Sequence, residues 1–414
     1  MKKRNLFLAT LGAGLLTAMS AGAVELTPME QLGKSIYFDN ISDPNSIGCA
    51  SCHAPRAGWT GPIAGINQHG AVYRGAVPQR FGNRKPPSAA YATLSPILHY
   101  DEVQNLFVGG NFWDGRATGL ILGNPAADQA GGPFLNPVEQ NMPSKTSVCE
   151  QVAGAAYAAL FEEVWGTGSL DCSLAGVDIT YDRIALSIAA YEASPEVNQF
   201  SSKYDAYLAG NAQLTDQELQ GLELFNGKAK CNLCHVSETG SNGEPPVFTD
   251  FTYDNLGVPI NPENPFYNMD QVYLDDGSVI NPLGSAWIDP GLGGFLATVP
   301  EWAALAPENY GKQKVPTLRN VAKGAGAGFP KAYMHNGVFK SLAEVVHFYN
   351  TRDVLPACET MPTGTIGVDC WPAPEVAVNV NHTELGNLGL SGDEEAALVA
   401  FMGTLSDTEK VSTK

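Results

Sequence analysis

Apolar residues recur at helical spacing in several separate segments, and capping signals mark where these segments begin. Thr27 and Thr215 each stand three residues before a glutamate. This capping box is typical of a helix N-terminus. A third box at Ser391 opens a final helix, and residues 180–209 hold a strong helical pattern that ends near Pro195. Strand signals are sparse, so the pattern predicts a mainly α fold.

The chain reads as two halves that begin alike. Each of the first two capped helices leads into a short cysteine-containing run, which indicates a tandem repeat at low identity. We predict an N-terminal domain over 24–205 and a C-terminal domain over 206–414, linked near 201–211. Residues 237–312 are rich in Gly, Pro, Asn and Asp and lack periodicity. We expect long ordered loops there.

The N-terminus has the pattern of a secretory signal peptide. A basic start is followed by an apolar stretch from Leu6 to about Met19, which is too short to span a bilayer, and by Ala21-Gly22-Ala23. We predict that residues 1–23 are removed near Ala23 and that the mature chain is periplasmic and does not span a membrane. The net charge of −19 argues against nucleic acid as a partner. The oligomeric state is unknown.

Two runs of the form C-x-x-C-H carry the clearest chemistry. This pattern is the covalent attachment site of c-type haem, with the histidine facing the iron as the proximal ligand. A zinc site is the alternative, but it needs four ligands and no partner pair lies nearby. The sequence therefore predicts two covalently bound haem c groups in tandem cytochrome c-like domains. The residues are Cys49, Cys52 and His53 in the first run, and Cys231, Cys234 and His235 in the second.

Four cysteines remain after these runs. An even number in an oxidising compartment indicates two disulfides. The local pairings are Cys149 with Cys172 and Cys358 with Cys370, each within one half of the chain. We expect both to be structural.

Several further runs resemble the bacterial di-haem cytochrome c peroxidase and MauG family. Together with the two haem motifs they extend over the mature chain in the order of that family. The runs are Phe112-Trp113-Asp114-Gly115-Arg116-Ala117, the segment from Gln129 to Glu139 ending Asn136-Pro137-Val138-Glu139, Lys314-Val315-Pro316-Thr317-Leu318-Arg319-Asn320, and Ala332-Tyr333-Met334-His335-Asn336-Gly337.

The resemblance assigns roles at the first haem, where peroxide reacts. Glu139 matches the acid/base carboxylate, which moves a proton during O–O cleavage, and Gln129 matches a second residue of that pocket. Trp113 matches a tryptophan that lies between the haems, although about six extra residues separate it from Gln129 relative to the family pattern. We expect Arg116 and Arg319 to neutralise haem propionates. The alternatives are a helix-capping or surface carboxylate for Glu139, a core aromatic for Trp113 and surface ion pairs for the arginines.

The second haem differs from the peroxidase pattern at its axial position. Fourteen residues after His335, where peroxidases of the family carry an axial Met, this chain has Tyr349. That matches the MauG-like branch, in which the second haem has His and Tyr ligands. A phenolate oxygen is a hard donor that favours oxidised iron. His347 is the rival ligand.

Two further ligand assignments stay open in the sequence. His69 falls where the peroxidases carry a sixth ligand of the first haem, whereas MauG-type proteins keep that site open; we favour an unligated His69. The family also holds a calcium ion between the haems. Asn83 is a candidate ligand, but Pro330 stands where a threonine is expected, which places calcium in doubt.

Three functions compete. The first is a MauG-like oxidase that uses hydrogen peroxide, through high-valent haems, to oxidise an aromatic residue of a partner protein; residues 65–92 look more like the MbnH type of this branch. The second is a cytochrome c peroxidase that reduces hydrogen peroxide with electrons from a small cytochrome or cupredoxin. The third is a di-haem electron carrier without enzymatic activity, which the Glu139 motif disfavours. We favour the first.

Overall fold

The computed structural model describes residues 25–274, 276–326 and 328–408, so the expected signal peptide lies outside the described residues. The expected mainly helical class is confirmed. The helices are α1 (Pro28–Phe38), α2 (Cys49–Cys52), α3 (Ala64–Gln68), α4 (Pro125–Leu135), α5 (Lys145–Gly154), α6 (Ala158–Trp165), α7 (Val177–Ala193), α8 (Lys203–Leu208), α9 (Asp216–Asn226), α10 (Gly291–Leu296), α11 (Leu342–Thr351) and α12 (Gly392–Gly403).

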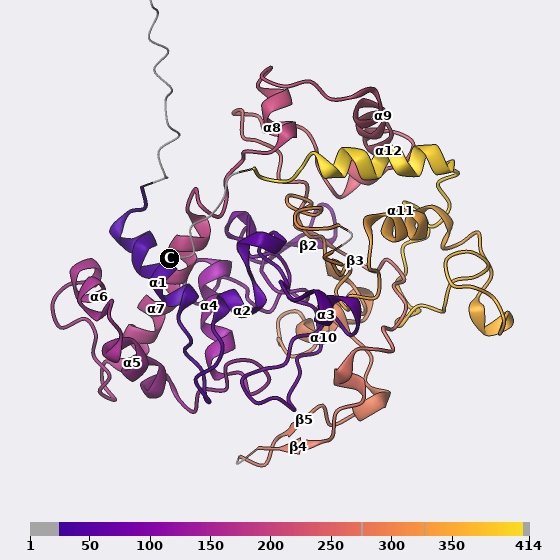
Figure 1. Cartoon of the computed structure of the whole chain (residues 1–414). Helices are drawn as coiled ribbons and strands as arrows, with labels where there is room; N and C mark the ends of the chain where they lie inside the picture. The colour runs from indigo at the N-terminus through magenta and orange to yellow at the C-terminus, as the bar shows by residue number, and fades with distance from the viewer. Residues whose placement is uncertain (1–24, 275, 327, 409–414) are drawn as a thin grey trace, which may run out of the picture.

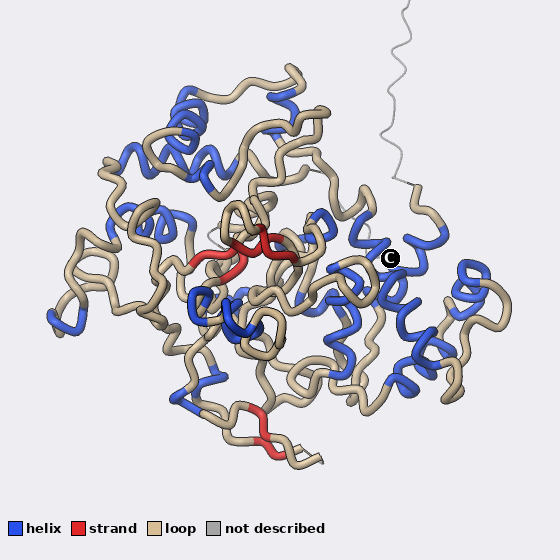
Figure 2. The backbone as a smooth tube through the Cα atoms, turned by 180° about the vertical axis from the view of Figure 1, so that it is seen from behind, coloured by secondary structure: helices blue, strands red, loops and turns tan. Residues whose placement is uncertain are grey.

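Short 3-10 turns and three short antiparallel pairs of strands accompany these helices in the described residues. β1 (His99–Asp101) pairs with β2 (Leu106–Val108), β3 (Tyr253–Asp254) with β6 (Gln313–Lys314), and β4 (Val272–Tyr273) with β5 (Val279–Ile280). Loops fill most of the space between the helical groups, as Figure 2 shows in tan. The expected loops over 237–312 are present, and the β4–β5 hairpin projects from them (Figure 1).

The three capping boxes form as expected at Thr27, Thr215 and Ser391. In each box the hydroxyl accepts from the backbone N–H three residues on, and the glutamate returns to the backbone of the cap. A similar box at Ser202 opens α8 within the segment expected to be a linker. That segment is therefore partly helical, because a local Ser–Asp pair satisfies its first free N–H groups.

The two halves use the same helix pairing. In the N-terminal half α1 packs on α7, and in the C-terminal half α9 packs on α12 (Figure 1). Gly33 and Gly221 each lie six residues after a capping threonine. A Cβ on Gly33 would overlap the Ser187 carbonyl, and one on Gly221 would overlap the Ala397 carbonyl. Glycine at this register therefore lets the helix backbones approach closely in both copies.

Two large apolar clusters follow this division. One is built from residues between Leu26 and Val197 and is centred on α1 and α7. The other is built from residues between Tyr204 and Leu405 and is centred on α9, α11 and α12. The domain boundary between 205 and 206 stays a prediction; the clusters themselves divide slightly earlier, since Tyr204 already belongs to the second one. No helix in the described part of the chain is long and apolar enough to cross a membrane.

Candidate functional site

Two cavities lie beside the two C-x-x-C-H runs, one in each half. Including their open mouths, they hold about 1690 Å³ of empty space in the N-terminal half and about 1550 Å³ in the C-terminal half. Trp113, Lys85 and Lys314 line both cavities. A shared wall therefore separates the two sites.

Both motif histidines are oriented as iron ligands. The Nδ1 atom of His53 lies 2.9 Å from the Pro87 carbonyl oxygen, and that of His235 lies 2.8 Å from the Phe248 carbonyl oxygen. A carbonyl accepts only from N–H, so Nδ1 carries the proton and Nε2 keeps its lone pair. Burial also lowers the pKa of His53 to about 4, which keeps the imidazole neutral. Both rings therefore fit a haem iron.

The cysteines divide as the sequence predicted. Cys49, Cys52, Cys231 and Cys234 are free, and each lines one of the two cavities. The Cys149–Cys172 and Cys358–Cys370 disulfides are present. The pairings are confirmed, and each cavity has the two thiols that covalent haem attachment requires.

The N-terminal cavity brings together the residues expected around peroxide. Gln129 comes from α4, and Glu139 follows the end of that helix; both line the cavity. The Asn136 side-chain amide donates to Glu139 at 2.7 Å. Burial raises the pKa of Glu139, while the positive charge of Arg116 and the Asn136 hydrogen bond oppose the shift. A carboxyl group with a raised pKa can both accept and return a proton.

Trp113 stands in the wall between the cavities. Its indole Nε1–H donates to the Lys85 carbonyl oxygen at 2.8 Å, and its ring meets that of His335 edge-on, with 6.4 Å between centroids. The indole is fixed in orientation and 9% exposed. Trp113 is therefore a large core aromatic that lines both cavities, and its role between the haems stays a prediction.

One buried acid of this cavity was not predicted from the sequence. Glu192 lies on α7, is 4% exposed and lines the N-terminal cavity. Among the described residues its carboxyl has no hydrogen-bond partner, and burial raises its pKa to about 8. The spacing could have indicated its burial, because Glu192 lies four residues after Ile188 and eight after Ile184, on the same apolar face of the helix.

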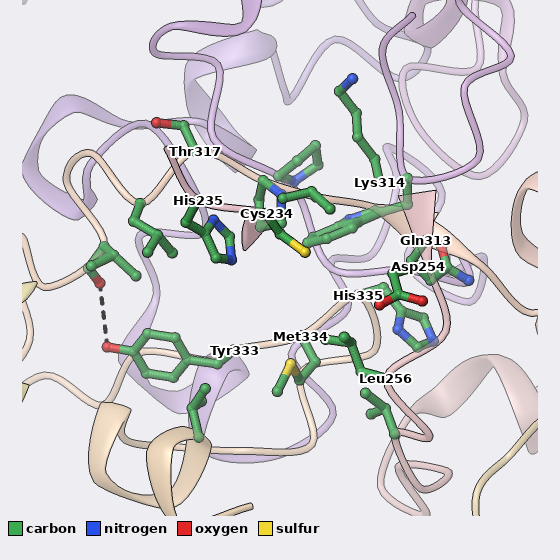
Figure 3. A pocket seen from close by; sticks show the side chains of 18 of the residues that line it. Cys234, His235, Asp254, Leu256, Gln313, Lys314, Thr317, Tyr333, Met334 and His335 are labelled. Carbon is green, nitrogen blue, oxygen red and sulfur yellow. Dashed lines mark hydrogen bonds between the residues drawn. The ribbon is translucent and has the colours of Figure 1, made fainter. Parts of the chain in front are cut away.

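Tyr349 and His347 occupy different surroundings at the C-terminal cavity, and the axial role of Tyr349 stays a prediction. Both lie on α11, but only Tyr349 lines the cavity, where its hydroxyl has no hydrogen-bond partner among the described residues. His347 instead places Nδ1 3.0 Å from Glu395 on α12. Figure 3 shows the His235 ring across the open space from Tyr333 and Met334. Met334 and Met402 also line this cavity, so two sulfur ligands compete with the phenol oxygen.

Each of the two arginines expected to bind propionates already binds a carboxylate of the protein. Arg116 lines the N-terminal cavity, is bound to Asp114 and stacks on Phe112 with 3.8 Å to the ring centroid. Arg319 lines the C-terminal cavity, but its two terminal nitrogens bind Asp205 at 2.9 and 2.8 Å. The carboxylate of Asp205 occupies the two-point face that a propionate would need. A propionate role for Arg319 stays a prediction.

His69 and Asn83, whose ligand roles the sequence leaves open, lie in different places. The His69 side chain is 72% exposed, lies 3.6 Å from Glu263 and does not line the N-terminal cavity. This placement supports the expected open first haem. Asn83 does line that cavity. The one cluster of potential metal ligands among the described residues is elsewhere, at Cys234, Asp254 and Glu384.

Comparison with known proteins gives a consistent result. Residues 27–213 match the family model described as di-haem cytochrome c peroxidase. The chain is similar to the methylamine utilization protein MauG of Paracoccus denitrificans (strain Pd 1222), with 35% identity over 381 residues, which is 91% of this chain and 88% of the relative. It is also similar to the cytochrome-c peroxidase IdrP2 of Denitromonas iodatirespirans, with 26% identity over 95% of this chain and 86% of the relative.

Solved structures agree. The diheme peroxidase BthA from Burkholderia thailandensis E264 superposes with a TM-score of 0.73 and 28% identity, covering 93% of this chain and 89% of that one. A MauG-like protein associated with microbial copper homeostasis has a TM-score of 0.60 and 22% identity, covering 96% of each chain. This second likeness concerns the fold alone, so the MbnH type stays a prediction.

Proposed function

Because the chain belongs to the di-haem cytochrome c peroxidase and MauG family, we propose that it uses peroxide to oxidise an aromatic side chain of a partner protein. It is a peroxide-dependent di-haem oxidoreductase. When bound in the two cavities, the haem groups supply the reaction with peroxide and the storage of the oxidising equivalents. The protein positions the groups and moves the protons.

The N-terminal cavity is the proposed site of the peroxide reaction. Here Glu139 takes the proton of one peroxide oxygen and returns it to the other, which becomes the leaving water. Asn136 holds the carboxyl in place, and Gln129 offers an amide that can orient the oxidant.

The shared wall provides the electronic connection. Trp113 borders both cavities and donates to the Lys85 carbonyl. This hydrogen bond fixes the orientation of the indole relative to the two sites. Indole is among the more easily oxidised side chains. We infer that Trp113 passes electrons from the C-terminal to the N-terminal site after peroxide has reacted.

The observation that carries the proposal is the position of Tyr349. Tyr349 lines the C-terminal cavity, and its hydroxyl has no hydrogen-bond partner among the described residues, whereas the side chain of His347 turns to Glu395. An oxygen ligand favours oxidised iron, while a sulfur ligand favours reduced iron. A site with this phenol therefore suits an enzyme that holds oxidising power more than one that stores an electron.

One titration with peroxide tests this function. Peroxide is added to the fully oxidised holoprotein and, separately, to protein that has first taken up one electron. We expect the fully oxidised form to react directly, with spectral changes at both haems and a near-infrared band. A reaction that occurs only after reduction would instead establish the cytochrome c peroxidase activity, with a small cytochrome or cupredoxin as donor.

Two variants sharpen the result. Tyr349→Met should make the second haem easier to reduce, and Trp113→Phe should slow its response to peroxide while the first haem still reacts. Unchanged spectra in the Tyr349→Met protein would assign the axial position to another residue, with Met334 and Met402 next to be replaced. The partner is identified by mass spectrometry of exported proteins incubated with the enzyme and peroxide, because export to the periplasm is part of the proposal.

A further inference from the structure

The wall between the two cavities contains two buried ammonium groups. Lys85 is 8% and Lys331 is 5% exposed, and both line the C-terminal cavity; Lys85 lines the N-terminal cavity as well. Lys85 Nζ donates to the Thr60 hydroxyl and the Pro86 carbonyl, each at 3.1 Å. Lys331 Nζ donates to the Asn320 carbonyl at 2.7 Å. Burial lowers the pKa of Lys85 to about 8 and the pKa of Lys331 well below its usual range, so both amines stay fully charged only beside a partner of opposite sign.

The protein itself does not supply that partner. In the ranges that the structure describes, neither ammonium has a carboxylate within 4 Å. Two buried acids, Asp114 and Asp289, are both bound by Arg84 at 2.6 Å. The balancing anion must therefore come from the occupant of the cavity.

The ammonium group of Lys314, a third lysine of this wall, has neutral groups of another kind around it. Its ammonium donates to the Gly109 carbonyl at 3.1 Å and lies 5.3 Å from the centroids of the Phe251 and Tyr253 rings. Aromatic faces and carbonyls together stabilise a cation. Burial still lowers the pKa of Lys314 to about 7, so these neutral groups compensate its charge only in part.

The same region does not fit the calcium ion that the family resemblance implies. Calcium takes six to eight oxygen ligands. The Asn83 carbonyl already accepts from Asn264, and the Pro330 carbonyl accepts from Asn67 at 3.2 Å. Proline offers no side-chain oxygen. Lys85 and Lys331 follow Asn83 and Pro330 by two residues and one residue, so buried positive charge stands where oxygen ligands are needed.

We propose that the ammonium groups of Lys85 and Lys331 replace a divalent cation between the haems and bind the propionate carboxylates of the haem in the C-terminal cavity. Two ammonium groups carry the same total charge as one calcium ion. The propionates are the two anionic groups of haem, so they are the carboxylates that this occupant can offer. This inference rests on the proposed occupation of both cavities by haem, and on nothing about the partner protein.

The first test measures calcium in the holoprotein. The protein is passed over a chelating resin, its calcium content is measured by plasma mass spectrometry, and its haem spectra and thermal unfolding are recorded with and without EGTA. We expect no stoichiometric calcium and no effect of EGTA. About one retained calcium per chain, or spectra that change with EGTA, would overturn the proposal.

The second test removes one positive charge at a time. Lys331→Met and Lys85→Met should lower the reduction potential of the second haem, because a nearby cation favours the reduced iron, while Lys331→Arg should retain the wild-type value. Lys145→Met removes an exposed lysine paired with Asp178 and serves as the control. If neither methionine variant differs from this control, the lysines do not face the propionates.

Failure of this inference can be distinguished from failure of the proposed function. The peroxide titration of the fully oxidised wild-type protein reports on the oxidase activity alone, and the calcium content reports on the lysine pair alone. Should the Lys85→Met protein fail to retain haem, Lys331→Met and the calcium measurement still decide the proposal.

Discussion

Replacement of Glu139 by glutamine tests the proton transfer at the N-terminal cavity. The change keeps the size of the side chain and the contact with Asn136, which is 2.7 Å long, but removes the ability to accept a proton. A positioned general acid–base group contributes about 10²- to 10⁴-fold to a rate. That range corresponds to roughly 3–5 kcal/mol of barrier. We expect a loss of this size in the reaction of the holoprotein with peroxide.

The assay is stopped-flow mixing of oxidised holoprotein with peroxide at several pH values, followed at the haem absorption band. Burial raises the pKa of Glu139. The carboxylate must be ionised to accept a proton, so the wild-type rate should fall as the pH decreases through this raised pKa. The Glu139→Gln protein should lack this decline.

Two controls separate this role from other effects of a lost charge. Glu163→Gln changes an exposed residue of α6 and should leave the rate unchanged. Glu192→Gln replaces the other buried acid of the same cavity with an amide that does not titrate. The reasoning is wrong if Glu139→Gln reacts as fast as wild type, or if Glu192→Gln loses as much activity as Glu139→Gln.

Three further predictions concern stability, each measured by thermal or denaturant unfolding of the holoprotein. Gly33→Ala should destabilise the fold by about 1–3 kcal/mol because its Cβ would overlap α7, whereas Gly131→Ala, with 3.4 Å to the nearest atom, should be neutral or stabilising. Glu192 has a pKa of about 8 when folded, so its contribution to stability is complete below its unfolded value and is lost as the pH rises towards 8. Glu192→Gln should therefore be more stable than wild type at pH 7 by up to about 3 kcal/mol and equal to it near pH 4. Equal stability of the two proteins at pH 7 would contradict this. Asp205→Asn should cost about 3–5 kcal/mol because it leaves Arg319, 1% exposed in its side chain, without its carboxylate, and a loss below 1 kcal/mol would show that solvent reaches the pair.

Several features of this protein are encoded locally and were predicted from the sequence. The capping boxes at Thr27, Thr215 and Ser391 depend on contacts three residues apart. The two haem motifs place both thiols and the histidine within five consecutive residues. The disulfides join cysteines separated by 23 and 12 residues. The tandem order of the halves follows from the same short-range signals.

Other features depend on which distant segments pack together, and only the tertiary structure decided them. Trp113 borders both cavities because the loop that carries it lies between the halves, and Arg319 binds Asp205, 114 residues away. Tyr349 and His347 share a helix, and the packing of α11 on α12 directs the histidine to Glu395 and leaves the tyrosine at the cavity. Burial of Lys85 and Lys331 is equally a result of long-range packing. Sequence spacing fixes what lies within one helical turn, whereas the surroundings of a side chain are set by chain segments far away along the sequence.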